Sequence, residues 1–190
     1  SQEEWLDLRR TGIGGSDAGA ILGLSKYNTP LGVWSEKTGL ADTELDNEQI
    51  LWGTALEPVI KQMLPKIIMR NEEIFTIVAD YPAIVCHDDY PWMQGNLDGL
   101  VIFPESKEAI LEVKVTNLRM AEQWKDDNMP DSAYCQVQHY MAITGHERAV
   151  VAPYIGNTLP YKYVPRNDEF IEKVLIPREQ LFWERNVMKR

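Results

Sequence analysis

The sequence has few cysteines and no long hydrophobic run, and each shortage excludes a class of protein. Cys86 and Cys135 are the two cysteines, which make no disulfide framework and lack metal-ligand spacing to each other. No apolar run approaches the length of a membrane span, and the N-terminal segment lacks the basic-then-apolar pattern of a signal peptide. We therefore expect a cytoplasmic protein in a reducing compartment, with no membrane partner.

Basic residues are also scarce. Lysine and arginine number 19 against 29 aspartates and glutamates, which gives a formal net charge of −10. A protein that coats nucleic acid non-specifically needs clustered positive charge, so this composition argues against such binding over the whole surface. A nuclease stays compatible with the charge if its basic residues gather in a cleft and if bound ions cancel the charge of metal-site carboxylates.

The remaining composition is that of a soluble globular protein. The chain has 190 residues, of which 44% are hydrophobic and 25% are charged. That length suffices for one domain with a substantial core, so we predict a single domain over residues 1–190. Helices, mixed strands, a helix, a hairpin and a last helix are predicted in that order. This order predicts an α+β, or mixed α/β, fold with a central mixed sheet flanked by helices.

Two short apolar runs, residues 98–103 and 109–115, are separated by a polar break and predict two neighbouring strands. On the second strand Glu112 and Lys114 are two residues apart, so their side chains point to the same face. An acid and a base amid branched apolar residues would make a poor core. Asp98, at the start of the first strand, can add a second carboxylate. The two strands together therefore predict a site for a divalent cation.

Magnesium suits this site because it takes one or two carboxylates and keeps several waters. We expect Asp98, Glu112 and a main-chain carbonyl such as that of Val113 to hold Mg²⁺, with Mn²⁺ as a possible substitute. The ion would lower the pKa of a bound water and offset charge on a phosphodiester. Lys114 would orient that water and stabilise its deprotonated form. The alternative reading is a surface ion pair at a strand edge, because the spacing alone is a weak pattern.

A glycine-rich segment, residues 11–23, predicts a tight turn that leads into a short helix with Ser16 or Asp17 as its N-cap. A helix N-terminus offers unpaired N–H groups and a favourable dipole to an anion. Arg9 and Arg10 lie just before the turn. Phosphate binding is therefore favoured over the alternative, a capped helix without a ligand.

A long helix is predicted over residues 47–70, with Glu57 among apolar neighbours. Pro58 and Pro65 predict boundaries or kinks in it, the first of them next to Glu57. A partly buried carboxylate needs a partner, and a cation or a metal-bound water would serve. The alternative is a solvated glutamate on the polar face of the helix.

Two further polar positions are expected near the site. Gln136 lies on a helix predicted over residues 131–144, shares a face with Tyr140, and is placed to bind the attacking water or the active lysine. Asp88 lies in a turn that leads to the same sheet edge. Cys135 and His139 are one helical turn apart, but a thiol or zinc enzyme is disfavoured, because no acid or third ligand joins them at a recognisable spacing.

Five segments together resemble the YqaJ-like viral recombinase family, the family of phage lambda exonuclease, within the PD-(D/E)xK nuclease superfamily. They follow one another in the family's order and with similar spacing: residues 5–18, 52–57, 97–99, 111–114 and 136–138. The motif proline of the superfamily is replaced here by Leu97.

The resemblance implies a restriction-endonuclease-like core and a Mg²⁺-dependent alkaline exonuclease. Such an enzyme digests one strand of linear double-stranded DNA from a 5′ end and leaves a 3′ overhang for a single-strand annealing protein in recombination. It also implies a phage or prophage origin and a homo-oligomer, a ring-shaped trimer around DNA. Two alternatives stay open: a structure-specific or nicking endonuclease of the same fold, and a non-catalytic DNA-binding or assembly protein.

The resemblance also implies a role for each principal site residue. Asp98 and Glu112 match the metal ligands, and Lys114 matches the catalytic lysine. Arg9 and Ser16 match positions that bind the terminal phosphate.

Accessory positions follow from the same resemblance. Glu57 matches a helical acid that contacts metal-bound water. Gln136 matches the glutamine of a QxxxY-type helix, with Tyr140 four residues on, and Asp88 matches another acid near the site.

Overall fold

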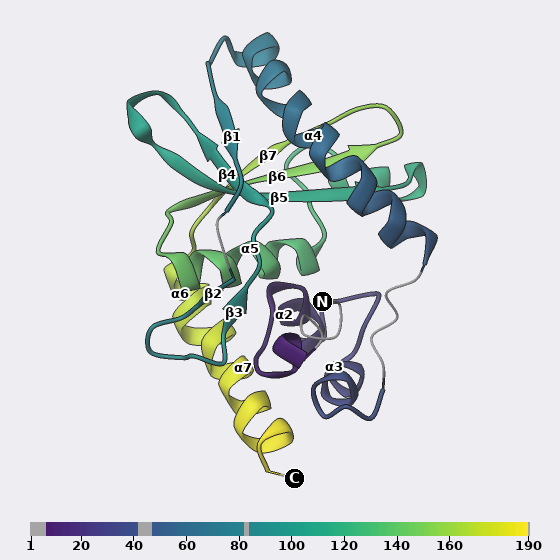
Figure 1. Ribbon diagram of the computed structural model, residues 1–190, viewed down its shortest axis with the longest axis vertical. Helices are drawn as coiled ribbons and strands as arrows, with labels where there is room; N and C mark the ends of the chain where they lie inside the picture. The colour runs from purple at the N-terminus through teal and green to yellow at the C-terminus, as the bar shows by residue number, and fades with distance from the viewer. Residues whose placement is uncertain (1–6, 42–46, 82–83, 190) are drawn as a thin grey trace.

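A five-stranded mixed sheet forms the centre of the computed structural model, which describes residues 7–41, 47–81 and 84–189 (Figure 1). Its strands lie in the order β1-β4-β5-β6-β7, with β5 and β6 parallel and the other neighbours antiparallel. Their bounds are β1 Ile77–Ala79, β4 Gly99–Ile102, β5 Glu108–Thr116, β6 Arg148–Ile155 and β7 Lys162–Pro165. Helices flank the sheet, so the predicted mixed α/β fold is confirmed.

Helix α4 (Glu48–Glu72) covers one face of the sheet (Figure 1). Three residues spaced four apart are buried against the strands: Ile60, Leu64 and Ile68. The helix is continuous through Pro58, so the boundary predicted next to Glu57 is wrong. A proline removes one backbone hydrogen bond, but the apolar face that packs on the sheet stabilises the helix on both sides of it.

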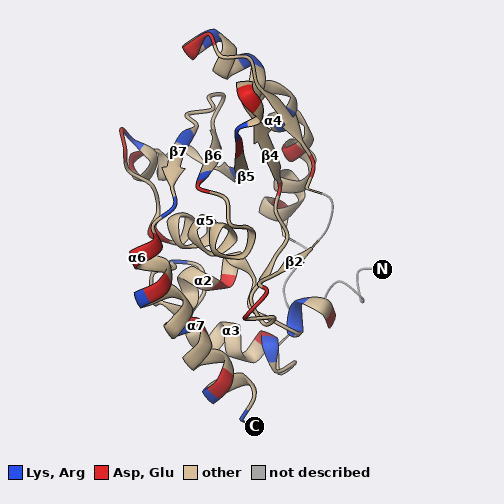
Figure 2. Ribbon diagram, turned by 90° about the vertical axis from the view of Figure 1, so that its left-hand side faces the viewer, with Lys and Arg blue, Asp and Glu red and all other residues tan. Residues whose placement is uncertain are grey.

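Helix α5 (Asp131–Thr144) covers the opposite face, and its predicted bounds are confirmed. It ends at Gly145, which takes the left-handed conformation at φ 75°. The other side of α5 packs against α2 (Gly15–Ile21) and the C-terminal helical segment. Figure 2 shows α5 as an almost uncharged ribbon between the sheet and these helices. Burial on both sides explains why its polar residues need partners inside the protein.

The hairpin predicted from the two apolar runs is confirmed as β4 and β5, with a short 3₁₀ turn at Pro104–Ser106. Alternation along β5 assigns each side chain to one face of the sheet. Ile110 belongs to the core under α5, and Leu111 belongs to the core under α4. Glu112 and Lys114 follow Ile110 at intervals of two, so both side chains face α5.

The other described elements lie around this three-layer core. They are helix α3 Pro30–Lys37, strands β2 Val85–Cys86 and β3 Gln94–Gly95, a 3₁₀ helix Leu118–Trp124, α6 Asp168–Phe170, a π-helix Ile171–Leu175, α7 Ile176–Phe182 and a π-helix Trp183–Val187. Strands β2 and β3 make a separate two-stranded sheet. Within the described ranges, none of the helices combines the length and the apolar character that crossing a bilayer requires.

Candidate active site

Asp98, Glu112 and Lys114 meet where β4 begins and β5 passes beside it. The Val113 amide donates a hydrogen bond of 2.7 Å to Asp98 Oδ2, which fixes the aspartate against β5. Lys114 Nζ lies 2.8 Å from Glu112 Oε1. Glu112 and Lys114, which alternation on the strand predicts on one face, therefore lie together on the α5 side of the sheet, and Asp98 is fixed against β5 next to them.

Asp98 and Glu112 place two buried carboxyl groups close to each other. Burial, followed by the negative charges of Glu112 and Glu57, raises the pKa of Asp98 to about 8, although the Val113 amide and Lys114 act in the opposite direction. Glu112 is only 3% exposed, and its Oε2 atom has no hydrogen-bond partner among the described residues. A divalent cation between the two acids would satisfy this oxygen and favour the ionised form of Asp98.

The donor set suits magnesium and not zinc. Among the described residues, no group of three or more His, Cys, Asp or Glu side chains gathers to hold a metal ion. Asp98 and Glu112 offer carboxylate oxygens, and Mg²⁺ binds proteins through as few as one or two carboxylates. A structural zinc site needs four side-chain ligands, usually Cys and His.

Lys114 is held by a chain of hydrogen bonds that crosses from β5 to α5. Its Nζ donates to Gln136 Oε1 at 2.6 Å, as predicted from the sequence. Gln136 Nε2 donates to the Tyr140 hydroxyl at 3.2 Å, and that hydroxyl donates to the Asn96 carbonyl at 3.2 Å. Gln136 is 7% exposed and Tyr140 is 5% exposed, so this chain fixes the ammonium group in place.

Glu57 lies close enough to raise the pKa of Asp98. Its carboxylate forms an ion pair of 2.7 Å with Lys61, whose ammonium group also lies 3.2 Å from Asp80. The Glu57 side chain is 35% exposed, so the predicted partial burial holds, with a lysine as partner.

Asp88 is exposed in the turn between β2 and β3. Among the described contacts, none joins it to Asp98. Its turn belongs to the separate two-stranded sheet of β2 and β3 and not to an edge of the central sheet, so its role near the site stays a prediction.

Helix α2 begins at Gly15, two or three residues earlier than the predicted N-caps imply. Gly14 is the N-cap, so the prediction of Ser16 or Asp17 at that position is wrong. Glycine has no capping side chain, and Asp17, at the third helical position, accepts a bond of 2.9 Å from the Gly14 amide instead. Ser16 is exposed, whereas Asp17 is buried.

Two neighbouring cavities are lined both by the residues predicted to bind phosphate and by residues of the hydrogen-bond chain that holds Lys114. One, of about 380 Å³, is lined by Arg9 and Ser16 together with Lys114 and Gln136. The other, of about 180 Å³, is lined by Arg9 and Ser16 together with Tyr140. An anion held at Arg9 and Ser16 would therefore lie in the same hollow as the ammonium group of Lys114.

Sequence reasoning did not identify Lys37, which also lines the smaller cavity. This lysine lies in the last turn of α3 and is 5% exposed. A lysine in the last turn of a helix is common, because its charge interacts favourably with the helix dipole, so no signal in the sequence marked Lys37. Arg10 does not line either cavity in the described part of the chain, and its guanidinium lies 3.4 Å from Asp7.

A model of the YqaJ-like viral recombinase domain matches residues 4–147. The uncharacterized protein YqaJ of Bacillus subtilis (strain 168) is 35% identical over 196 residues, which cover 99% of this chain and 57% of that protein. Protein D345L of African swine fever virus (strain Badajoz 1971 Vero-adapted) is 37% identical over 62 residues, 33% of this chain and 18% of that protein. The chain thus spans well under two thirds of the length of these relatives.

Two solved structures share the fold. The alkaline exonuclease LHK-Exo from Laribacter hongkongensis superposes with a TM-score of 0.74 at 19% identity, over 96% of this chain and 91% of that chain. A phage related exonuclease from Haemophilus somnus 129PT gives a TM-score of 0.63 at 12% identity, over 95% of this chain and 97% of that chain. At these identities the similarity shows a common fold.

Proposed function

On the premise that the chain belongs to the YqaJ-like viral recombinase family, as its sequence motifs predicted, we propose that it is a Mg²⁺-dependent exonuclease. It digests one strand of linear double-stranded DNA from 5′ ends and leaves 3′ overhangs. One observation carries the proposal: two carboxylates, one of them with a buried unpartnered oxygen, adjoin a lysine that shares a cavity with a predicted phosphate site. The fold shared with two exonucleases supports it.

Asp98, Glu112 and the carbonyl of Val113 would hold the ion, which when bound supplies Lewis-acid activation of water and neutralises phosphodiester charge. Lys114 lies between Glu112 and Gln136, and its third N–H would orient the attacking water and stabilise the deprotonated form of that water. Gln136 restrains the ammonium group, which lowers the entropic cost of alignment. Glu57, once released from Lys61, would orient a second water.

Arg9 and Ser16 bind the terminal 5′-phosphate and so give the enzyme its requirement for an end. A guanidinium group binds phosphate through paired N–H donors, and a hydroxyl donates one more bond. The net charge of −10 suits a ring-shaped homotrimer whose positive groups face inward on the DNA. A single-strand annealing protein would receive the 3′ overhang, in the cytoplasm of a bacterium that carries the phage or prophage.

Digestion of linear and closed circular duplexes tests this function. The wild type should degrade linear duplex in Mg²⁺ and leave circular duplex intact, whereas an endonuclease of the same fold would cut both. Lys114→Ala and Glu112→Ala should abolish cleavage while circular dichroism shows an intact fold. Equal activity of wild type and Lys114→Ala would leave only a DNA-binding role.

A second comparison tests the end site. Arg9→Ala should weaken the preference for phosphorylated ends. If the wild type cuts unphosphorylated ends equally well, the role given to Arg9 is wrong.

A further inference from the structure

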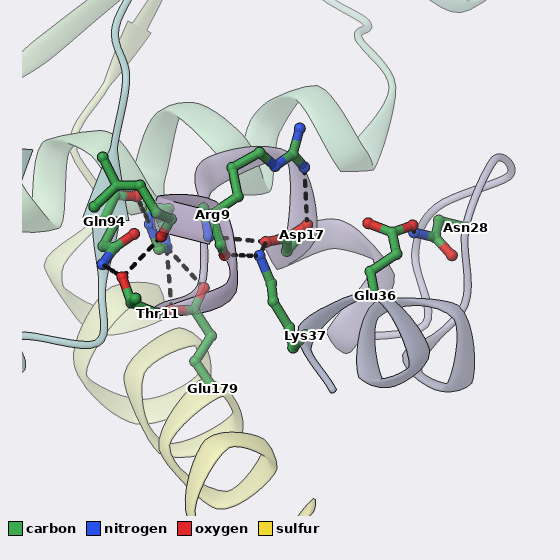
Figure 3. A network of polar contacts seen from close by, with 11 residues as sticks. Arg9, Thr11, Asp17, Asn28, Glu36, Lys37, Gln94 and Glu179 are labelled. Atoms are coloured by element: carbon green, nitrogen blue, oxygen red, sulfur yellow. Dashed lines mark hydrogen bonds and ion pairs between the residues drawn. The ribbon is translucent and has the colours of Figure 1, made fainter. Parts of the chain in front are cut away.

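A buried ion pair lies directly behind Arg9. Lys37 Nζ is 2.6 Å from Asp17 Oδ2, and each side chain is 3% exposed. Figure 3 shows the Lys37 ammonium pointing at the Asp17 carboxylate, with the Arg9 guanidinium above the same carboxylate. The lysine comes from α3 and the aspartate from α2, so the pair joins two helices.

The pair contacts Arg9 at both its main chain and its side chain. Lys37 Nζ donates a bond of 2.8 Å to the Arg9 carbonyl oxygen. Asp17 Oδ1 lies 3.8 Å from Arg9 Nη2. Asp17 also accepts the Gly14 amide, and therefore fixes the turn that lines the smaller cavity.

The charges of these three residues affect how strongly the cavity binds an anion. Asp17 alone would cancel the charge of Arg9 and repel a phosphate. Lys37 cancels Asp17 instead, so the three side chains together carry a charge of +1. Interactions over a few ångströms in a partly buried site are weakly screened, so removing one unit charge changes anion affinity about tenfold or more.

We propose that Lys37 and Asp17 are positioning residues that set the preference of the Arg9 cavity for a DNA end with a terminal phosphate. The inference rests on the proposed function and names residues behind the phosphate contact. Lys37 strengthens phosphate binding by neutralising Asp17 and by fixing the Arg9 main chain. Asp17 limits that binding while it holds the turn in shape.

A purely structural ion pair makes a different prediction. Replacing either member of a buried pair leaves the other unpaired, so both single variants would damage the site in the same direction. The charge account requires opposite directions. Lys37→Met should weaken the phosphate preference, and Asp17→Asn, whose amide oxygen still accepts the Gly14 amide, should strengthen it.

The experiment measures dissociation constants in EDTA for one duplex oligonucleotide that carries either a 5′-phosphate or a 5′-hydroxyl. The phosphate preference is the dissociation constant of the 5′-hydroxyl duplex divided by that of the 5′-phosphate duplex. This ratio should fall about tenfold in Lys37→Met and rise severalfold in Asp17→Asn. Steady-state digestion in Mg²⁺ should show the same changes in KM, with smaller changes in kcat. Lys66→Met removes a lysine from an exposed position on α4 and is the matched control, with an unchanged ratio.

Each outcome decides the inference. If both variants lower the ratio, or if a folded Lys37→Met protein keeps it, the inference is overturned while the exonuclease proposal stands. If Lys37→Met does not fold, Asp17→Asn decides alone: a higher ratio supports the inference and an equal or lower ratio overturns it. If the wild type has no phosphate preference, the inference falls together with the role of Arg9, whereas Mg²⁺-dependent cleavage is judged separately by digestion.

Discussion

Lys114 on β5 and Gln136 on α5 share a hydrogen bond of 2.6 Å, although 22 residues separate them in the chain. The bond ties the ammonium group of the sheet to the helix that covers it. Because Glu112 lies 2.8 Å away on the other side of the same nitrogen, Lys114 is restrained from both sides. The position of the Lys114 ammonium group is therefore set by tertiary packing.

Gln136→Ala should lower kcat on linear duplex about 10-fold to 100-fold, because the lysine loses one of its two anchors and the attacking water is aligned less well. DNA binding in EDTA should change little. Steady-state digestion in Mg²⁺ checks this, with Gln62→Ala on the exposed side of α4 as the control. An unchanged kcat in Gln136→Ala would show that the hydrogen bond does not position Lys114.

Asp98→Asn should stabilise the metal-free protein. Burial and the neighbouring Glu112 raise the pKa of Asp98 to about 8, so ionising this group costs free energy of folding. That cost is absent below the ordinary pKa near 3.8 and grows as the pH rises toward about 8. Asparagine keeps the acceptor for the Val113 amide. We expect a gain of about 1 kcal/mol, or 2–4 °C in Tm, at pH 7.

Thermal unfolding in EDTA at pH 4 and pH 7 measures this difference. The gain should vanish at pH 4 and reverse at pH 7 when Mg²⁺ is added, since only the wild type keeps both carboxylate ligands. If Asp98→Asn were less stable than the wild type in EDTA at pH 7, ionising Asp98 beside Glu112 would not carry the free-energy cost proposed above.

The buried pair His139 and Glu179 should make stability depend on pH. His139 Nδ1 lies 2.9 Å from Glu179 Oε1, and Nε2 lies 2.9 Å from the Gln94 carbonyl oxygen. Burial alone would lower the pKa of His139, but the charge of Glu179 and these hydrogen bonds raise it overall. A histidine whose pKa is raised on folding contributes stability, which is fully present below its unfolded-state pKa of about 6.5. This contribution is lost as the pH rises through the folded-state pKa. The free energy of unfolding should therefore fall as the pH rises above about 6.5.

Urea unfolding across this range measures the slope. Glu179→Gln is the matched control, because its amide can donate to Nδ1 of a neutral ring and leaves no shared proton to lose. The variant should be less stable at pH 6.5 and show a flatter profile. A wild-type profile as flat as that of the variant would contradict the prediction.

Gly15→Ala should damage both stability and activity. A Cβ atom at Gly15 would lie 2.4 Å from a ring carbon of Tyr140, whose hydroxyl belongs to the hydrogen-bond chain that holds Lys114. Overpacking of this kind costs about 1–3 kcal/mol. Gly53→Ala is the control: nothing lies within 4 Å of its Cβ position on α4, so the substitution should stabilise by up to about 1 kcal/mol. Equal behaviour of the two alanines in thermal unfolding would refute the close contact.

The sequence predicted those features that local patterns determine. Alternation on one strand placed Glu112 and Lys114 on a common face, and helical spacing with a following glycine set the end of α5 at Gly145. These rules depend only on neighbours along the chain. The hydrogen bond between Lys114 and Gln136 is one of the two alternatives predicted for Gln136, the other being a bond to the attacking water.

Features that depend on distant segments were missed. Pro58 lies inside an unbroken helix because the sheet stabilises both sides of it. The turn that holds Asp88 belongs to a separate sheet because β2 and β3 pair with each other. Lys37 can be buried because it forms an ion pair with Asp17 and a hydrogen bond to the Arg9 carbonyl oxygen. No pattern within α3 indicates partners so far away in the chain.

Timed digestion of a linear, 5′-phosphorylated duplex, labelled at either the 5′ or the 3′ terminus, tests the central claim most directly. In Mg²⁺ the wild type should release the 5′ label first and leave the 3′ label on a long strand, and EDTA or Glu112→Gln should stop the reaction. Digestion that continues in EDTA, or that survives Glu112→Gln in Mg²⁺, would contradict a metal-dependent site built from Asp98, Glu112 and Lys114.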